Sequence, residues 1–354
     1  MNSRLIAFTG PDRGPARGVA STARHAGLAT RAVALASLML FAGVLLGSTA
    51  ARAQYASMDV AAPRYEWRGR IETDFRNEFD TKTDGGDEFR SWRVGAAGDF
   101  GGPINESILV GVRAGYQYSR YDFNLQHGSG DPPNYSTNQL PRDPWNSINT
   151  ADLTPSTTIL VGDRFAVVAA VPIRWSAENG ARRNALTAGI SGIVLWQVTD
   201  SFQIGGGIGV TSQLESNAET FPIVSFDWQI TNDVELRTEG GWIQGGKTTL
   251  LYGPNRAVRL TFSAGYERNR FRLDDNGSRT DRNGIGEVTA VPIEVGLRFE
   301  FYENAFFDFH VGLGVAGRFR IENDNGDKLY DQQYDPAPRI GVGLTLPFGL
   351  PGGV

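Results

Sequence analysis

Charged residues stand at every second position near the start of the chain, and this row is the most concentrated chemistry that the sequence offers. The intervening positions are mostly apolar or aromatic, from Tyr65 to Phe79. A mixed-sign row can form Arg–carboxylate pairs, or it can line a pore and orient charged solutes. Both interpretations stay open at this point. The row consists of Arg64, Glu66, Arg68, Arg70, Glu72, Asp74, Arg76 and Glu78.

Later segments carry charged groups on the polar parity as well. We predict that they face the same lumen as the first row and extend it into a charge ladder. These residues are Arg259, Glu294, Arg298, Glu300, Asp308, His310, Arg318 and Arg320.

The sequence offers little for catalysis. A barrel enzyme needs a His beside a Ser or acidic partner, and beyond the N-terminal segment only His127 and His310 remain. His310 lies two residues from Asp308, on the parity that we predict to face away from lipid. The chain has no cysteine, which excludes disulfides and thiolate metal sites. We therefore expect no catalytic residues, no cofactor and no metal, and an outer-membrane enzyme is the least favoured function.

Strict alternation is typical of a β-strand whose two faces meet opposite environments. Sixteen residues at about 3.3 Å each span about 50 Å, far more than an ordinary strand. A tilted strand that crosses a bilayer and projects beyond it has these proportions. A soluble barrel would also alternate, with its apolar parity inside, so the rest of the chain must decide.

Three further features favour the membrane. Tight connections alternate with longer polar ones, notably 124–153, 274–284 and 323–336, aromatic residues gather at strand ends, and the polar parity mixes glycine with charge. Short periplasmic turns, long outer loops and aromatic girdles characterise outer-membrane barrels. We predict an all-β, antiparallel, up-and-down transmembrane barrel of about 14 strands (12–14), counting two weakly patterned segments at 157–161 and 248–252.

The chain begins with an export pattern. A basic region leads into an apolar run over 32–46 and a small-residue site, Ala51-Arg52-Ala53. We predict a signal peptide over 1–53, a short periplasmic segment over 54–63, the barrel over 64–348 and a tail over 349–354. Without residues 1–53 the chain has 28 basic and 38 acidic residues, a formal charge of −10, which argues against nucleic acid as a partner.

Two features predict contacts with the membrane system. The last strand alternates up to Phe348, similar to the C-terminal signature by which the barrel-assembly machinery recognises outer-membrane barrels. Arg268, Arg270 and Arg272 continue the lipid-facing parity beyond Tyr266. Because Arg is costly in hydrocarbon, we expect them at the head groups, contacting lipid phosphates. Solvent exposure or cross-strand carboxylates are the alternative.

Several segments resemble an uncharacterised family of predicted bacterial outer-membrane β-barrels, over most of the chain after the signal peptide. The resemblance implies the fold and the location but no activity. Its carriers are Gly207-Ile208-Gly209-Val210, Gln213-Leu214-Glu215, Phe221-Pro222-Ile223-Val224, the run from Tyr266 to Leu273, Gly286-Glu287 and Val291-Pro292-Ile293.

The leading functional prediction is a porin-like passive channel for small solutes in the outer membrane of a Gram-negative-type bacterium. The alternative is a non-conducting structural or binding barrel, closed by Arg–carboxylate pairs and the 124–153 loop. Expected partners are outer-membrane lipid, the assembly machinery and a small solute. The sequence does not determine the oligomeric state.

Overall fold

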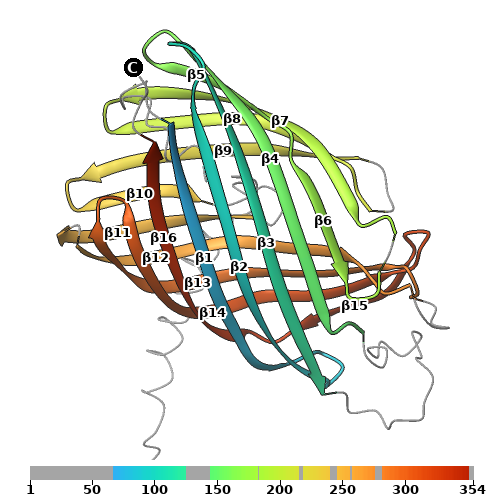
Figure 1. The fold of residues 1–354 in the computed structure, drawn as a ribbon. Coiled ribbons are helices and arrows are strands. Elements are labelled where there is room, and N and C mark those ends of the chain that lie inside the picture. Colours follow the sequence, from blue (N-terminus) through green and yellow to red (C-terminus); the bar gives the residue numbers. More distant parts are fainter. Residues whose placement is uncertain are drawn as a thin grey trace, which may run out of the picture. The chain divides into compact units, whose positions relative to one another are not determined.

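The structure is a computed structural model that describes residues 67–124, 144–181, 183–214, 218–239, 245–255, 257–275 and 281–350. The predicted signal peptide, the 54–63 segment, Arg64, Glu66 and His127 lie outside the described residues. Within them, all regular structure is β (Figure 1). The strand segments are β1 (Trp67–Lys82), β2 (Glu88–Pro103), β3 (Ile108–Asn124), β4 (Ser147–Val161), β5 (Phe165–Ala170), β6 (Ile173–Glu178), β7 (Leu186–Thr199), β8 (Phe202–Thr211), β9 (Glu219–Thr231), β10 (Val234–Glu239), β11 (Gly245–Asn255), β12 (Val258–Arg272), β13 (Ile285–Tyr302), β14 (Ala305–Glu322), β15 (Lys328–Tyr334) and β16 (Ala337–Leu350).

These sixteen segments form fourteen wall strands, because two strands are interrupted. β5 and β6 both pair with β4 and β7 and are separated by Val171 and Pro172. β15 and β16 both pair with β14 and are separated by Asp335 and Pro336. Proline lacks the N–H that a strand ladder needs. Antiparallel pairing of β1 with β16 and of β11 with β12 closes the barrel, which confirms the predicted fold and strand number.

Two predicted loops are shorter than expected. β4 begins at Ser147, so half a strand belongs to what we predicted as the 124–153 loop, and β15 lies inside the predicted 323–336 loop. The first part of β4 reads Ser-Ile-Asn-Thr-Ala-Asp and carries no apolar alternation. Its pairing with β3 and β6, and not its own pattern, makes it a strand.

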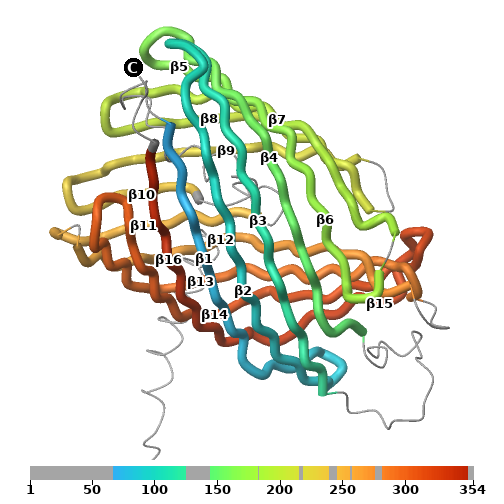
Figure 2. Tube along the Cα trace, viewed as in Figure 1, coloured from blue at the N-terminus to red at the C-terminus, as the bar shows by residue number. Residues whose placement is uncertain are grey.

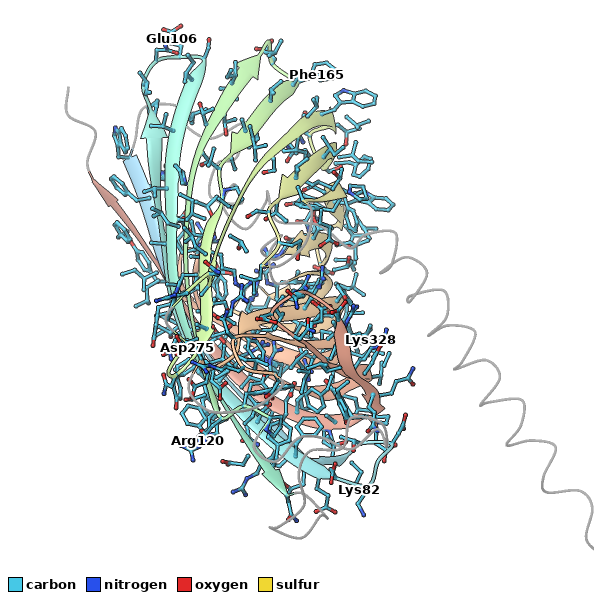
Figure 3. The ribbon with its side chains drawn as sticks, turned by 90° about the vertical axis from the view of Figure 1, so that its right-hand side faces the viewer. Lys82, Glu106, Arg120, Phe165, Asp275 and Lys328 are labelled. Atoms are coloured by element: carbon cyan, nitrogen blue, oxygen red, sulfur yellow. The ribbon has the colours of Figure 1, made fainter. Side chains whose placement is uncertain are left out.

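The barrel has a turn end and a loop end (Figure 3). Glu106 and Phe165 mark the turn end, whereas Lys82 and Arg120 lie toward the opposite, loop end. Short turns such as 104–107, 200–201 and 303–304 connect strands at the turn end. The Cα trace shows the long strands running from one end to the other (Figure 2).

In the turn-end part, apolar side chains point outward and charged ones point inward. On β13, Ile293, Val295 and Leu297 are 37–38% exposed, while Glu294 and Arg298 on the other parity are buried. Ile71 and Phe75 on β1 are likewise exposed. A closed barrel whose outer wall is apolar is built to face lipid. The predicted orientation, apolar parity outside and charged parity in the lumen, holds here.

Toward the loop end the barrel narrows. β7 to β11 end early, and β12 continues past β11 to meet β6, where Arg272 and Ala177 form a parallel bridge. Thr83 bridges to Tyr334, which joins β1 to β15. Nine strand segments of the described chain therefore enclose the loop end, and we call this part the head. It comprises residues 79–82, 88–92, 119–124, 147–150, 176–178, 268–272, 285–289, 317–322 and 328–334. The remaining fourteen-stranded part is called the tube.

The polarity of the wall reverses between tube and head. Inside the head lie Phe89, Phe271 and Phe319, each 0–1% exposed, whereas Arg90 pairs with Asp122 on the outside. On most strands the alternation continues without a slip. The outward-facing residues change from apolar in the tube to charged or polar in the head, and the inward-facing residues change the opposite way.

β14 reverses by a different device. A register shift between Thr289 and Val291 on β13 marks an extra residue on β14, where Ala316 adopts a positive φ of 51°. A β-bulge of this kind turns every following side chain to the other face. Phe319 thus points inward, and Arg318 and Arg320 point outward.

Candidate functional site in the lumen

An aromatic core fills the head. Trp145, just before β4, is 1% exposed and lies edge-on to Phe271 and Phe319, with ring centroids 5.2 and 5.5 Å apart. Phe89 packs 4.5 Å from Phe319 and 4.8 Å from Tyr334. Edge-to-face packing at these separations is favourable. Packed rings therefore occupy the lumen at the loop end.

A layer of ion pairs lies directly beneath the core and centres on Glu267 of β12. Arg76 and Arg93, from the opposite wall, both bind Glu267 Oε1, and the Arg93 contact measures 2.9 Å. Arg339 binds Glu267 Oε2 at 3.2 Å and Glu78 at 2.6 Å. These contacts cross the lumen and tie β12 to β1, β2 and β16. Glu267, Arg93 and Arg339 were not among the predicted site residues, although the polar parity of their strands marks them.

His310 and Glu294 extend this layer. His310 Nε2 lies 3.9 Å from Glu294 Oε1, and Arg76 Nη2 lies 3.7 Å from the same oxygen. Gly341 faces this group across the strand pair, and a Cβ there would collide with the His310 ring. Gly314 leaves room for the Arg339 guanidinium in the same way. Lumen glycines therefore make space for charged side chains, as their parity suggested.

Three further groups of ion pairs line the tube. Arg113 binds Glu72 at 2.8 Å and Asp99 at 3.4 Å, and Arg70 also binds Asp99, at 3.0 Å.

The Arg298–Asp308 pair is bidentate, with contacts of 2.7 and 2.9 Å. Arg259 bridges Glu235 at 3.0 Å and Glu300 at 3.6 Å. Bidentate pairs of this type are the strong ones among hydrogen-bonded ions.

The lumen wall opposite these charges is apolar. Val168, Ile193, Leu195 and Ile223, on β5, β7 and β9, form one buried cluster. Their side chains lie over glycines of β8; at Gly205, for example, a Cβ would collide with Leu195. The tube interior thus has a charged wall and an apolar wall.

The structure places the described residues of the predicted ladder on two different faces. From Arg68 to Asp74 and from Arg259 to His310, its described members lie on the lumen parity, while Arg64 and Glu66 lie outside the described residues. Arg318 and Arg320 are wrong as lumen residues, because the bulge at Ala316 turns them outward. Arg318 pairs with Asp331 and Arg320 with Glu322. Burial alone would raise the pKa of Asp331, but bonded Arg318 and Lys328 hold that pKa below its ordinary value.

Arg268, Arg270 and Arg272 lie on the outward parity as predicted, but their contacts match the alternative to lipid. Arg268 binds Glu219 at 2.8 Å and Glu287 at 3.0 Å, and Arg270 pairs with Glu322. Arg272 is wrong as a head-group contact, since it is fully buried. Its guanidinium donates to the carbonyls of Asn184, Leu214 and Asn283 and so ties three connections to β12.

Polar contacts support the seam between β6 and β12. Arg174 is 3% exposed and donates to Asn269 at 2.8 Å, and Glu178 accepts from the backbone N–H of Asp274 at 3.0 Å. The single bridge between β6 and β12 supplies few ladder hydrogen bonds. These side-chain contacts therefore hold the two strands together.

Phe348 lies near the end of β16, 44% exposed, opposite Gly69 and 6.1 Å from Phe100. Its role as an assembly signal stays a prediction. The last strand runs beyond it to Leu350.

No helix in the described residues is long and apolar enough to cross a membrane. Comparison with models of protein families and with curated proteins finds no match.

Solved structures with similarity include bacterial outer-membrane channels. An outer membrane channel from Pseudomonas putida F1 aligns at 9% identity and TM-score 0.43, covering 81% of this chain and 97% of its own. The Ralstonia pickettii toluene transporter TbuX aligns at 9% and 0.42, covering 85% and 95%. A Pseudomonas aeruginosa FadL homologue aligns at 13% and 0.41, covering 85% and 97%.

Proposed function

We propose that this chain is an outer-membrane transport barrel that is closed at rest and whose lumen accepts a small amphipathic solute. The observation that carries the proposal is the aromatic core around Trp145, which fills the head above a layer of ion pairs. A permanently open porin would leave a water-filled path along its axis. The packed rings favour a barrel that does not leak ions.

The two walls of the tube support the choice of solute. Arg–carboxylate pairs line one side of the tube, and the Val168–Ile193–Leu195–Ile223 cluster lines the other. A small molecule with one polar end and an apolar body suits both walls, and it would reach the apolar one by parting side chains that are 1–6% exposed. An ordinary hydrated ion gains nothing from the apolar wall.

Planar-bilayer recording tests the proposal. We expect the wild type to show no steady conductance and Trp145→Ala to open a measurable one, because removing the indole takes away the centre of the core. Trp175→Ala is the matched control, since Trp175 is 38% exposed on the outer wall. It should stay as silent as the wild type.

Two outcomes would contradict the proposal. Steady conductance of the wild type would show that the core does not close the lumen. If Trp145→Ala and Phe271→Ala both keep the heat-resistant folded band but neither conducts, the ion-pair layer closes the lumen by itself. The second candidate function, a non-conducting structural barrel, would then be favoured.

A further inference from the structure

Among the described rings of the aromatic core, Trp145 alone does not belong to a strand. Phe89 and Phe319 each pair on both sides, Phe89 in β2 between β1 and β3 and Phe319 in β14 between β13 and β15. The pairing of β4 with β3 starts just after Trp145, where the Tyr121 N–H donates to the Asn146 carbonyl at 2.7 Å. Side-chain packing therefore holds Trp145 in place, whereas ladder hydrogen bonds also hold the other rings.

The Trp145 indole connects three strands across the head. The ring centroids of its partners lie 5.2–5.9 Å away, and every pair is edge-on: Tyr121 and Phe123 of β3, Phe271 of β12 and Phe319 of β14. Such contacts favour the buried position of the indole. Moving the indole out of the core would break these four contacts and no strand pairing.

The indole N–H of Trp145 opposes this packing. Its Nε1 atom is buried and has no hydrogen-bond partner among the described residues. The core tyrosines nearby are satisfied, because the Tyr334 hydroxyl donates to the Thr289 carbonyl at 3.2 Å and Tyr330 bonds to the Gln332 side chain at 2.8 Å. A buried donor without an acceptor destabilises the state that buries it, since water would bond to it. The unsatisfied donor thus lies on the core ring that the ladder restrains least.

We infer that Trp145 is the gate of the lumen. Its side chain leaves the core toward the loop end, where water accepts from the indole N–H, while the strands of the head stay paired. The next residue, Asn146, is exposed, so solvent lies one residue away. Moving elements of this kind come from the least stable parts of a structure. The inference deepens the proposed function and rests on it, since it names the moving part of a barrel that is closed at rest.

Replacing Trp145 by β-(3-benzothienyl)alanine tests the gate, because this amino acid has sulfur in place of the N–H and keeps the shape of the indole. In planar bilayers with potassium chloride, we expect the wild type to show brief openings. The replacement should lower their frequency by about tenfold, because the closed state then buries no unsatisfied donor. The same replacement at Trp175, which is exposed on the outer wall, is the matched control and should leave the frequency unchanged.

Fluorine NMR gives a second measurement that does not depend on conduction. In protein labelled with 5-fluorotryptophan, the Trp145 signal is the one that Trp145→Phe removes, and Trp175→Phe identifies the control signal in the same way. We expect saturation transfer to show the Trp145 signal exchanging between a buried main state and a water-exposed minor state. The Trp175 signal should show one state.

Three outcomes would overturn the gate: a wild type without any brief opening, an unchanged or higher opening frequency after the replacement at Trp145, or a single state of the Trp145 signal. Steady conductance of the wild type would instead refute the proposed function. A wild type without steady conductance that conducts in Trp145→Ala, but whose Trp145 signal shows one state, would refute the moving indole and leave the transport barrel standing.

Discussion

The tube and the head have opposite wall polarity, although they are continuous along the same strands. In the tube, Val311 and Phe309 face outward and are 36–40% exposed, while Asp308 and His310 of the same strand face the lumen. In the head, Phe319 and Ile321 face inward and are fully buried, and Arg318 and Arg320 face outward. The tube is built for a surrounding hydrocarbon, and the head is built like a small water-exposed barrel with its own core. We therefore expect the wall to leave the membrane near the level of Glu267.

The largest expected effect comes from deleting Ala316. Without the extra residue, Phe319 and Ile321 would turn to water and Arg318 and Arg320 into the core. We expect no heat-resistant folded band on gels. Ala316→Gly is the control, because it keeps the residue count and suits the positive φ of 51°; it should stabilise the barrel by up to about 1 kcal/mol. A folded deletion variant would show that the bulge does not set the polarity of β14.

Removing an aromatic side chain should cost more in the head than in the tube. We expect Phe319→Ala to lower the free energy of unfolding by about 3–5 kcal/mol, because it leaves a cavity in a packed core. Phe309→Ala, on the same strand but facing lipid, should cost much less, since lipid chains fill the space. Urea unfolding in lipid vesicles gives both values, and equal losses would mean that the head has no separate core.

An added charge on the outer wall should destabilise the barrel more in the tube than in the head. Val311→Arg and Ile71→Arg should each cost about 2–4 kcal/mol if they lie near the bilayer midplane. Asn124→Arg, on the exposed outer face of the head beside Glu88, should leave unfolding in the same vesicles almost unchanged. Equal tolerance at both levels would refute the assignment of the tube to the membrane.

The smallest effect is expected for the ion pairs on the outer face of the head. Arg318→Ala should change the free energy of unfolding by about 0–1 kcal/mol, because the side chain is half exposed and pairs with Asp331 in water. Whatever difference exists should shrink as salt is raised from low to physiological strength. A large, salt-independent loss would place Arg318 in a dry environment and contradict the outward orientation of this part of β14.

The charge ladder could be predicted in part from the sequence. Alternation placed Arg70, Glu72 and Asp308 correctly, because a strand's side-chain period is fixed at two and depends on no distant contact. For Arg318 and Arg320 the same rule predicted the wrong face, because one extra residue at Ala316 reverses the parity. The sequence around Ala316 carries no proline or glycine–asparagine signal that would mark this bulge. The partners of each charge could not be predicted, because Glu267 meets Arg76 across the lumen at a separation of 191 residues.

The sequence by itself determined the barrel class, its strand number and which parity of the tube faces lipid. Those properties follow from local periodicity and from apolar side chains that must avoid water or charged ones that must avoid hydrocarbon. Only the tertiary structure decided that packed rings fill the loop end. This core needs Phe89, Trp145, Phe271 and Phe319 from four separate regions to meet inside the head, with β6 and β12 drawn together above the shorter strands. No local pattern encodes such a meeting, because it depends on where strands end relative to one another.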